Sequence, residues 1–252
     1  MIISSTTISP LSLKRSGDGV PPLISTMKHE WYFNNVQNAS GNIITIPDTG
    51  TVGGLDLSNT ALANKPTQSS IGSKISEAAD GVDDYLYKAT TNFMKSMTTW
   101  MVTFVFKYDN SGNNVFLSVA NETNTKIEGI TFQHITAGGG SLRTNIWDGS
   151  GTLTIPMVHA LPLTNGNDYI ITYAWDGTNL KAFNETTQIF STVTPNPFSI
   201  PATTHNVSVM SRIAPNASNY FGYGNIGYIG IDEIDLTRLN ANVATLKTTF
   251  GI

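Results

Sequence analysis

Apolar and polar side chains alternate in short stretches along most of this chain, and clusters of Gly, Asn and Asp separate these stretches from about residue 40 onward. The clearest stretch spans residues 100–107, where one face carries Trp100, Val102, Phe104 and Phe106. A period of two residues is typical of a β-strand that buries one face. The pattern therefore predicts a core strand here, with its more apolar face in the interior.

Further segments show the same pattern. Residues 169–175 and 180–183 flank the tetrapeptide Asp176-Gly177-Thr178-Asn179, and an Asp-Gly pair between two such segments is a strong signal for a β-hairpin. Residues 207–212 and 226–234 predict two more strands. Helical periodicity is nearly absent from this part of the chain, so the pattern predicts an all-β sandwich.

The N-terminal part of the chain lacks this pattern. Residues 1–35 are rich in Ser, Thr and Pro, with scattered apolar positions and no helical period. We expect an extended arm over 1–35 that anchors the chain to a partner, and one domain over residues 36–252. A disordered leader or a first edge strand are the alternatives for the arm.

Only the C-terminus predicts a helix. Asn240 is expected to cap a short helix that Gly251 ends. The apolar residues Val243, Leu246 and Phe250 recur at near-helical spacing between them. We expect this helix to close one edge of the sandwich.

Composition narrows the classes of function. Charged residues make up 13% of the chain, with 14 Lys and Arg against 18 Asp and Glu, so no basic surface is expected for nucleic acid. The absence of cysteine excludes a disulfide framework and a cysteine nucleophile. The sequence shows neither a secretory signal nor an apolar stretch of membrane-spanning length, so we expect no membrane insertion.

Four segments follow one another in a familiar order: Asp80-Gly81-Val82-Asp83-Asp84-Tyr85-Leu86, then residues 99–107, 169–181 and 227–234. They are similar to an early strand entry, a core strand, a later hairpin and a closing strand. Together they resemble a laminin-G-like, concanavalin-A-like jelly roll. The resemblance implies a β-sandwich, but this fold hosts lectins, glycan-binding modules, glycosidases and virion proteins, so it selects no activity.

The first of these segments also contains three acidic residues in a glycine-containing turn. Asp80, Asp83 and Asp84 offer carboxylate oxygens, which calcium prefers as ligands, and the resemblance to lectin-like jelly rolls implies such a role. The alternative is an ordinary solvated turn. Apart from calcium, we expect no cofactor.

Aromatic residues near predicted turns are candidates for stacking on sugar rings. Trp147 precedes Asp148-Gly149, and Tyr220 and Tyr223 lie in a Gly- and Tyr-rich segment before the last predicted strand. Packing at the rim of the domain, or contacts between subunits, is the alternative role for the same residues.

No catalytic site is expected. Glu233-Ile234-Asp235 resembles the catalytic strand of family-16-like glucanases, but Arg238 stands where that motif needs its third carboxylate, and an arginine cannot act as a general acid. The G-x-G-x-x-G match at residues 222–227 precedes a predicted strand, whereas a dinucleotide site needs a helix there.

The leading hypothesis is a non-enzymatic bacteriophage virion protein, such as a head-decoration, head-fibre or tail-associated subunit. We expect it to be located in the virion, to contact other virion proteins through its arm, to form homo-oligomers and to bind cell-surface glycans. One alternative is a bacterial carbohydrate-binding module or adhesin, at the cell surface or extracellular. A glycan hydrolase or lyase is the other alternative.

Overall fold

The structure, a computed structural model, describes residues 22–35, 37–39, 42–59, 65–91, 93–123, 126–136, 140–148, 153–159, 161–194, 204–211 and 222–252. The strands are β1 (His29–Tyr32), β2 (Gln37–Ala39), β3 (Asn42–Ile46), β4 (Leu57–Ser58), β5 (Thr67–Ile71), β6 (Lys74–Asp80), β7 (Leu86–Thr91), β8 (Trp100–Lys107), β9 (Asn114–Thr123), β10 (Lys126–Ile135), β11 (Ser141–Asp148), β12 (Leu153–His159), β13 (Asp168–Trp175), β14 (Asn179–Asn184), β15 (Thr187–Val193), β16 (His205–Val209) and β17 (Tyr223–Asp232). The helical elements are the 3-10 helices η1 (Phe33–Asn35), η3 (Phe93–Ser96) and η5 (Leu236–Arg238) and the α-helix α1 (Leu239–Phe250). The described residues confirm the all-β prediction.

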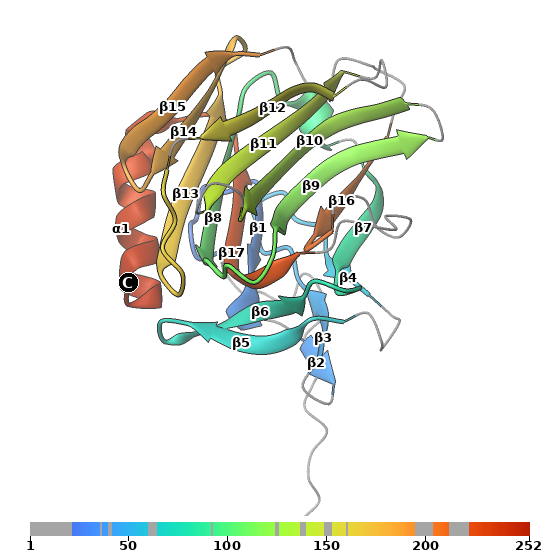
Figure 1. The fold of residues 1–252 in the computed structure, drawn as a ribbon, viewed down its shortest axis with the longest axis vertical. Helices are drawn as coiled ribbons and strands as arrows, with labels where there is room; N and C mark the ends of the chain where they lie inside the picture. Colours follow the sequence, from blue (N-terminus) through green and yellow to red (C-terminus); the bar gives the residue numbers. More distant parts are fainter. Residues whose placement is uncertain are drawn as a thin grey trace, which may run out of the picture.

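The strands form two layers, with β9–β12 lying across β8, β13 and β17 (Figure 1). The sheet that packs against α1, called the helix-side sheet from here on, has antiparallel neighbours in the order β15-β14-β13-β8-β17. The other side of β17 pairs with β1 and with β6, and β6 pairs in turn with β5. The opposite sheet has the order β12-β11-β10-β9-β16-β7-β4-β3-β2. A pairing of Asn42 with Thr67 joins the two layers at one side. This is the jelly-roll sandwich that the sequence predicts.

The main core lies between the two sheets. The face of β8 that was predicted to pack inside is fully buried there: Trp100, Val102, Phe104 and Phe106. The Phe104 ring lies 5.5 Å from that of Phe132, and the Phe106 ring lies 4.2 Å from that of Phe116. Full burial of each such side chain contributes about 1.5–3 kcal/mol to stability, which explains why this strand is the clearest in the sequence.

The second face of β8 is buried as well. Met101 and Val105 pack in a separate apolar cluster with Val243, Leu246 and Phe250 of α1. The helix therefore covers the outer face of the helix-side sheet, and the prediction that it closes an edge was wrong. Because this sheet is apolar on both faces, its outer face needs a second layer to exclude water.

The helix ends as predicted but begins differently. Gly251 has a left-handed φ of 74°, and its N–H donates to the carbonyl of Lys247, which is the usual glycine stop. At the other end α1 begins at Leu239, so Asn240 is not its cap. The side chain of Asp235 instead accepts from the N–H of Thr237 and caps η5, which runs directly into α1.

Residues 22–35, which the sequence analysis assigned to the arm, belong to the sandwich. Strand β1 pairs with the C-terminal half of β17, from His29 opposite Ile231 to Tyr32 opposite Tyr228. Residues 1–21 lie outside the described residues, so an anchoring arm remains a prediction for that segment alone. An edge strand was the alternative, and for His29–Tyr32 the structure has a strand.

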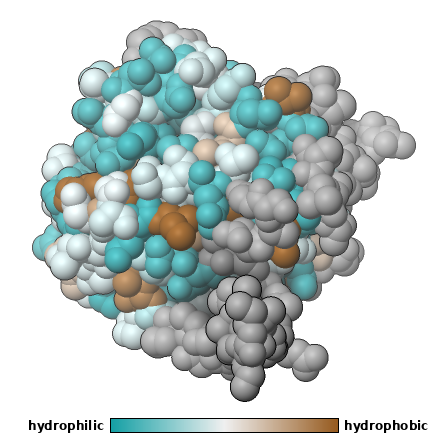
Figure 2. All heavy atoms as spheres, turned by 90° about the horizontal axis from the view of Figure 1, so that it is seen from below, coloured by the Kyte–Doolittle hydropathy of each residue, from teal (hydrophilic) through white to brown (hydrophobic). Residues whose placement is uncertain are grey.

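Within the described residues, no helix is long and apolar enough to cross a membrane. Figure 2 shows one face of the molecule, on which hydrophobic residues lie in small separate areas among hydrophilic ones wherever the surface is not grey. Among the described residues, the large apolar side chains with the highest exposure are Val52, Val82 and Val193.

Candidate functional site

The turn between β6 and β7 brings together the three acidic residues that the sequence predicts as calcium ligands. One carboxylate oxygen each of Asp80, Asp83 and Asp84 lies within 4.8 Å of the other two. Gly81 has a φ of 77°, which allows the chain to reverse directly after Asp80. We call these three residues the acidic turn.

Hydrogen bonds hold the acidic turn in shape. The N–H of Asp80 donates to Asp84 Oδ2 at 3.0 Å, and the N–H of Val82 donates to Asp80 Oδ1 at 2.8 Å. The carboxylates are therefore positioned by the backbone itself. Among the described residues, none of the three forms an ion pair with Lys or Arg.

The three acids of the turn differ in exposure, from the exposed Asp80 through the half-buried Asp83 to the buried Asp84. Asp84 is 7% exposed. Burial raises the pKa of Asp84 to about 6, although a hydrogen bond from Asp80 opposes the rise, and the nearby charges of Asp80 and Asp83 add to it. The folded protein therefore disfavours the charged form of Asp84 unless a positive charge is supplied.

A fourth acid lies near the acidic turn. Glu77 of β6 is fully buried on the same strand face as Ala79, and neither of its carboxyl oxygens has a hydrogen-bond partner. Burial raises the pKa of Glu77 well above its usual range, and the charge of Asp84 raises it further. Sequence reasoning missed Glu77, although an acidic residue at an inward position of an alternating strand could have identified it.

Tyr223 lies beside the acidic turn. It is the direct cross-strand partner of Asp80, so the two side chains project from the same sheet face. Its ring packs against Gly81 and Gly112, and a Cβ atom at either glycine would collide with it. The carbonyl of Tyr223 also lies 3.3 Å from His134 Nε2. The half-buried ring is thus held firmly at the end of the sandwich.

The other two predicted aromatic contacts differ from Tyr223. Trp147 is only 4% exposed and lies in β11 opposite Gly129, so its ring offers no free face to a sugar. Its prediction as a platform is corrected, because Trp147 belongs to the packing of the opposite sheet. Tyr220 lies outside the described residues. The structure therefore unites the acidic turn with Tyr223 and separates both from Trp147.

The acidic turn fits the ligand requirements of calcium. Calcium takes about six to eight oxygen ligands, with carboxylates as the preferred charged ones. Asp80, Asp83 and Asp84 offer two oxygens each, of which one on Asp80 and one on Asp84 already accept backbone hydrogen bonds. The turn would supply part of a coordination shell, and water or a bound ligand would have to supply the rest.

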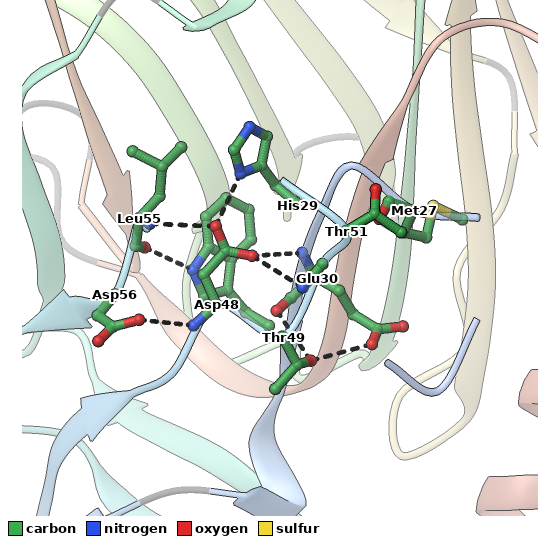
Figure 3. Close-up of polar contacts among 10 residues, drawn as sticks. Met27, His29, Glu30, Asp48, Thr49, Thr51, Leu55 and Asp56 are labelled. Atoms are coloured by element: carbon green, nitrogen blue, oxygen red, sulfur yellow. Dashed lines mark hydrogen bonds and ion pairs between the residues drawn. The ribbon is translucent and has the colours of Figure 1, made fainter. Parts of the chain in front are cut away.

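A second acidic cluster fixes the N-terminal segment (Figure 3). Asp48 accepts from His29 Nδ1 at 2.7 Å and from the N–H groups of Glu30, Gly50 and Leu55. The side chain of Asp48 has no exposed surface, and that of His29 is 5% exposed. We call His29, Glu30 and Asp48 the N-terminal clasp.

Glu30 completes the clasp from the other side. Its carboxylate accepts from the N–H groups of Leu23 and Ile24 at 2.6 and 2.9 Å, and from the hydroxyls of Thr49 and Tyr228 at 3.0 and 2.9 Å. Burial raises the pKa of Glu30, and these hydrogen bonds oppose the rise. Because every partner belongs to the protein, the clasp is structural.

The glucanase-like segment has no acid and base arrangement. Glu233 is exposed and pairs with Lys28 at 2.6 Å, while Arg238 pairs with Asp232 and Asp235. The pKa of Glu233 is lowered by Lys28, and that of Asp235 is lowered by Thr237 and Arg238. A general acid needs a raised pKa.

The glycines at 222–227 lead into β17 rather than a helix, which excludes the dinucleotide loop.

Solved structures of known proteins are similar to this chain in fold. A structure of the Trypanosoma rangeli sialidase in complex with sialic acid matches 90% of this chain with a TM-score of 0.58 and 8% identity, over 33% of the sialidase chain. The same sialidase with 2,3-difluoro-KDN matches 96% of this chain with a TM-score of 0.57 and 8% identity, over 36% of its chain. This chain thus spans about a third of the sialidase.

The CBM40 of the Ruminococcus gnavus IT-sialidase, bound to α2,3-sialyllactose, matches 60% of this chain and 85% of its own length, with a TM-score of 0.49 and 14% identity. That score is too low to bear on function. No protein-family model matches the sequence, and no curated protein sequence matches it. At these identities the likeness to the sialidase structures shows a shared β-sandwich fold.

Proposed function

We propose that this protein is a non-enzymatic glycan-binding β-sandwich whose site is the acidic turn together with Tyr223, with calcium as the bound cation. The observation that carries the proposal is the convergence of three carboxylates within 4.8 Å beside a half-buried aromatic ring. Neither feature alone indicates a glycan, but sugars combine hydroxyl oxygens with an apolar ring face. A cation and an aromatic ring recognise these two parts.

A bound calcium ion would connect the acidic turn to the sugar. A calcium ion would neutralise the carboxylates of Asp80, Asp83 and Asp84 and so offset the burial and the like charges that together raise the pKa of Asp84. The coordination positions that the turn leaves open would accept sugar hydroxyls. The ring of Tyr223 would pack on the apolar face of the sugar.

Calcium binding is tested by isothermal titration of the EDTA-treated full chain. We expect saturable binding that Asp83→Asn and Asp84→Asn each weaken. The matched control is Asp176→Asn, because Asp176 lies in the β13–β14 turn and pairs with Lys181. Unchanged calcium binding in both acidic-turn variants would remove the cation from the proposal.

Glycan binding is tested on immobilised glycans in calcium and in EDTA. We expect calcium-dependent binding that Tyr223→Ala weakens at least about fivefold and Tyr223→Phe largely retains, since Phe keeps the ring. Binding of no glycan in calcium contradicts the proposal. Release of free sugar from a bound glycan would instead favour a hydrolase, with Asp84 as the acid because its pKa is raised to about 6.

The virion role rests on the sequence alone and stays a prediction. Its proposed anchoring segment is now limited to residues 1–21, because β1 lies in the sheet. A deletion through residue 35 would remove a paired strand and damage the fold. We expect a chain lacking residues 1–21 to remain folded but to be lost from purified particles, as measured by mass spectrometry of those particles.

A further inference from the structure

The helix-side sheet ends in a strand without a second neighbour among the described residues. Strand β15 pairs with β14, from Asn184 opposite Thr187 to Asn179 opposite Val193, and no other described strand is in register with it. The outer side of an edge strand presents backbone N–H and C=O groups that can pair with another strand.

Strand β15 lacks most of the features that usually protect an edge. Its seven residues, Thr187-Gln188-Ile189-Phe190-Ser191-Thr192-Val193, include no charge, no proline and no glycine. Val193 is 67% exposed. Edges are commonly blocked by Lys, Pro, a β-bulge or a covering segment. Of these, the described part of β15 has only a bulge at Ile189, where two residues of β15 oppose one of β14.

The other sheet edges differ. Strand β12, at the end of the opposite sheet, contains Pro156, which lacks an N–H group. Strand β5, at the far side of the helix-side sheet, is bridged to β3 through Thr67 and Asn42. Strand β2, at the other end of the opposite sheet, has only three residues, and very short edge strands offer little to a partner. Strand β15 is therefore the longest of these edge strands that has neither a charge nor a proline.

We propose that β15 pairs antiparallel with β15 of a second copy of this chain, so that a two-fold axis crosses the strand. The resulting dimer would join two helix-side sheets edge to edge through main-chain hydrogen bonds. The inference does not depend on the proposed glycan or calcium site.

Charge favours a second copy as the occupant. A two-fold axis places β15 against itself, and a strand without charged residues meets no like charge in that arrangement. The charged groups near the two ends of the strand are already paired within one chain. These pairs are Lys247 with Glu185 at 2.9 Å and Lys181 with Asp176 at 2.8 Å.

Light scattering of the full chain is the first test. We expect a mass of twice the 27.2 kDa chain, and a shift to the single-chain mass in the double variant Gln188→Lys with Thr192→Lys, because a two-fold axis at the strand centre places residue 188 of one copy opposite residue 192 of the other and so brings like charges together. The control is Val52→Lys, which adds charge at an exposed position outside β15. A monomeric wild type overturns the proposal, and so does a dimer that survives the two lysines or that Val52→Lys also breaks.

Cross-linking gives a second test, which does not depend on how well the fold tolerates lysine substitutions in β15. The chain contains no cysteine, so single cysteines placed in turn at residues 187–193 can form only intermolecular disulfides. The two-fold axis places only residues at the centre of the strand close to the same residues of the second copy. We expect covalent dimers there and none at the strand ends, whereas no covalent dimer at any position contradicts pairing through β15.

Discussion

The N-terminal clasp and the acidic turn each contain a buried acid, but the protein surrounds the two carboxyl groups with different partners. In the clasp, Glu30 is fully buried and accepts four hydrogen bonds from the protein. In the acidic turn, the carboxylate of Asp84 faces Asp80 and Asp83 without a described Lys or Arg partner. The first cluster is complete, whereas the second lacks a positive charge.

The difference separates a structural acid from a binding acid. Donors around Glu30 favour its charged form and connect residues 23–24 to Tyr228, which lies about 200 residues away in the chain. Burial of Asp84, together with the like charges of Asp80 and Asp83, disfavours its charged form, so the turn is destabilised until a cation binds. A buried acid therefore indicates a ligand-binding site only when no hydrogen-bond donors or positive charges of the protein itself compensate its charge.

Removal of Glu30 is expected to have the largest effect. Glu30→Ala leaves two backbone N–H groups and the Tyr228 hydroxyl without their acceptor, and should destabilise the fold by about 3–5 kcal/mol. Urea unfolding measures this loss. Glu30→Gln keeps one carbonyl acceptor and should lose less. A loss below about 1 kcal/mol for Glu30→Ala would mean that the clasp does not hold the segment.

Neutralising Asp84 is expected to act in the opposite direction. In calcium-free buffer at pH 7, Asp84→Asn should stabilise the fold by about 1–3 kcal/mol, because the pKa of Asp84 is raised from 3.8 to about 6 in the folded protein. Between these two values the folded state binds more protons than the unfolded state, so the wild type loses stability as pH rises. Thermal unfolding measures the difference.

Two conditions sharpen the Asp84 prediction. Below pH 3.8 the carboxyl is protonated in both states, and the advantage of Asp84→Asn should disappear. In calcium the order should reverse, because binding to the folded state stabilises the wild type. An advantage that is the same at every pH would show that charge is not its cause.

The smallest effect is expected for Glu233→Gln. Glu233 is exposed and pairs only with Lys28 among the described residues, and surface ion pairs contribute little. The midpoint of urea unfolding and the binding of calcium should both remain unchanged. A clear loss of calcium or glycan binding would relocate the site from the acidic turn to the glucanase-like segment.

Much of the sheet could be predicted because its signals are local. The strand at 100–107 and the hairpin around Asp176-Gly177 follow from alternation and turn chemistry within a few residues. The clustering of Asp80, Asp83 and Asp84 was also local, since one turn contains them all. Tyr223 was predicted from its aromatic type and its place near a predicted turn, whereas its position beside Asp80 required the pairing of β17 with β6.

The sequence by itself determined the all-β class, the main core strand and the acidic turn, because a period of two and a glycine-containing turn act over short distances. Only the tertiary structure decided that His29–Tyr32 join the sheet, that α1 covers a face and that Glu77 is buried without a partner. These outcomes depend on which strands become neighbours. Contacts between residues 200 positions apart leave no pattern in either segment that a local reading can detect.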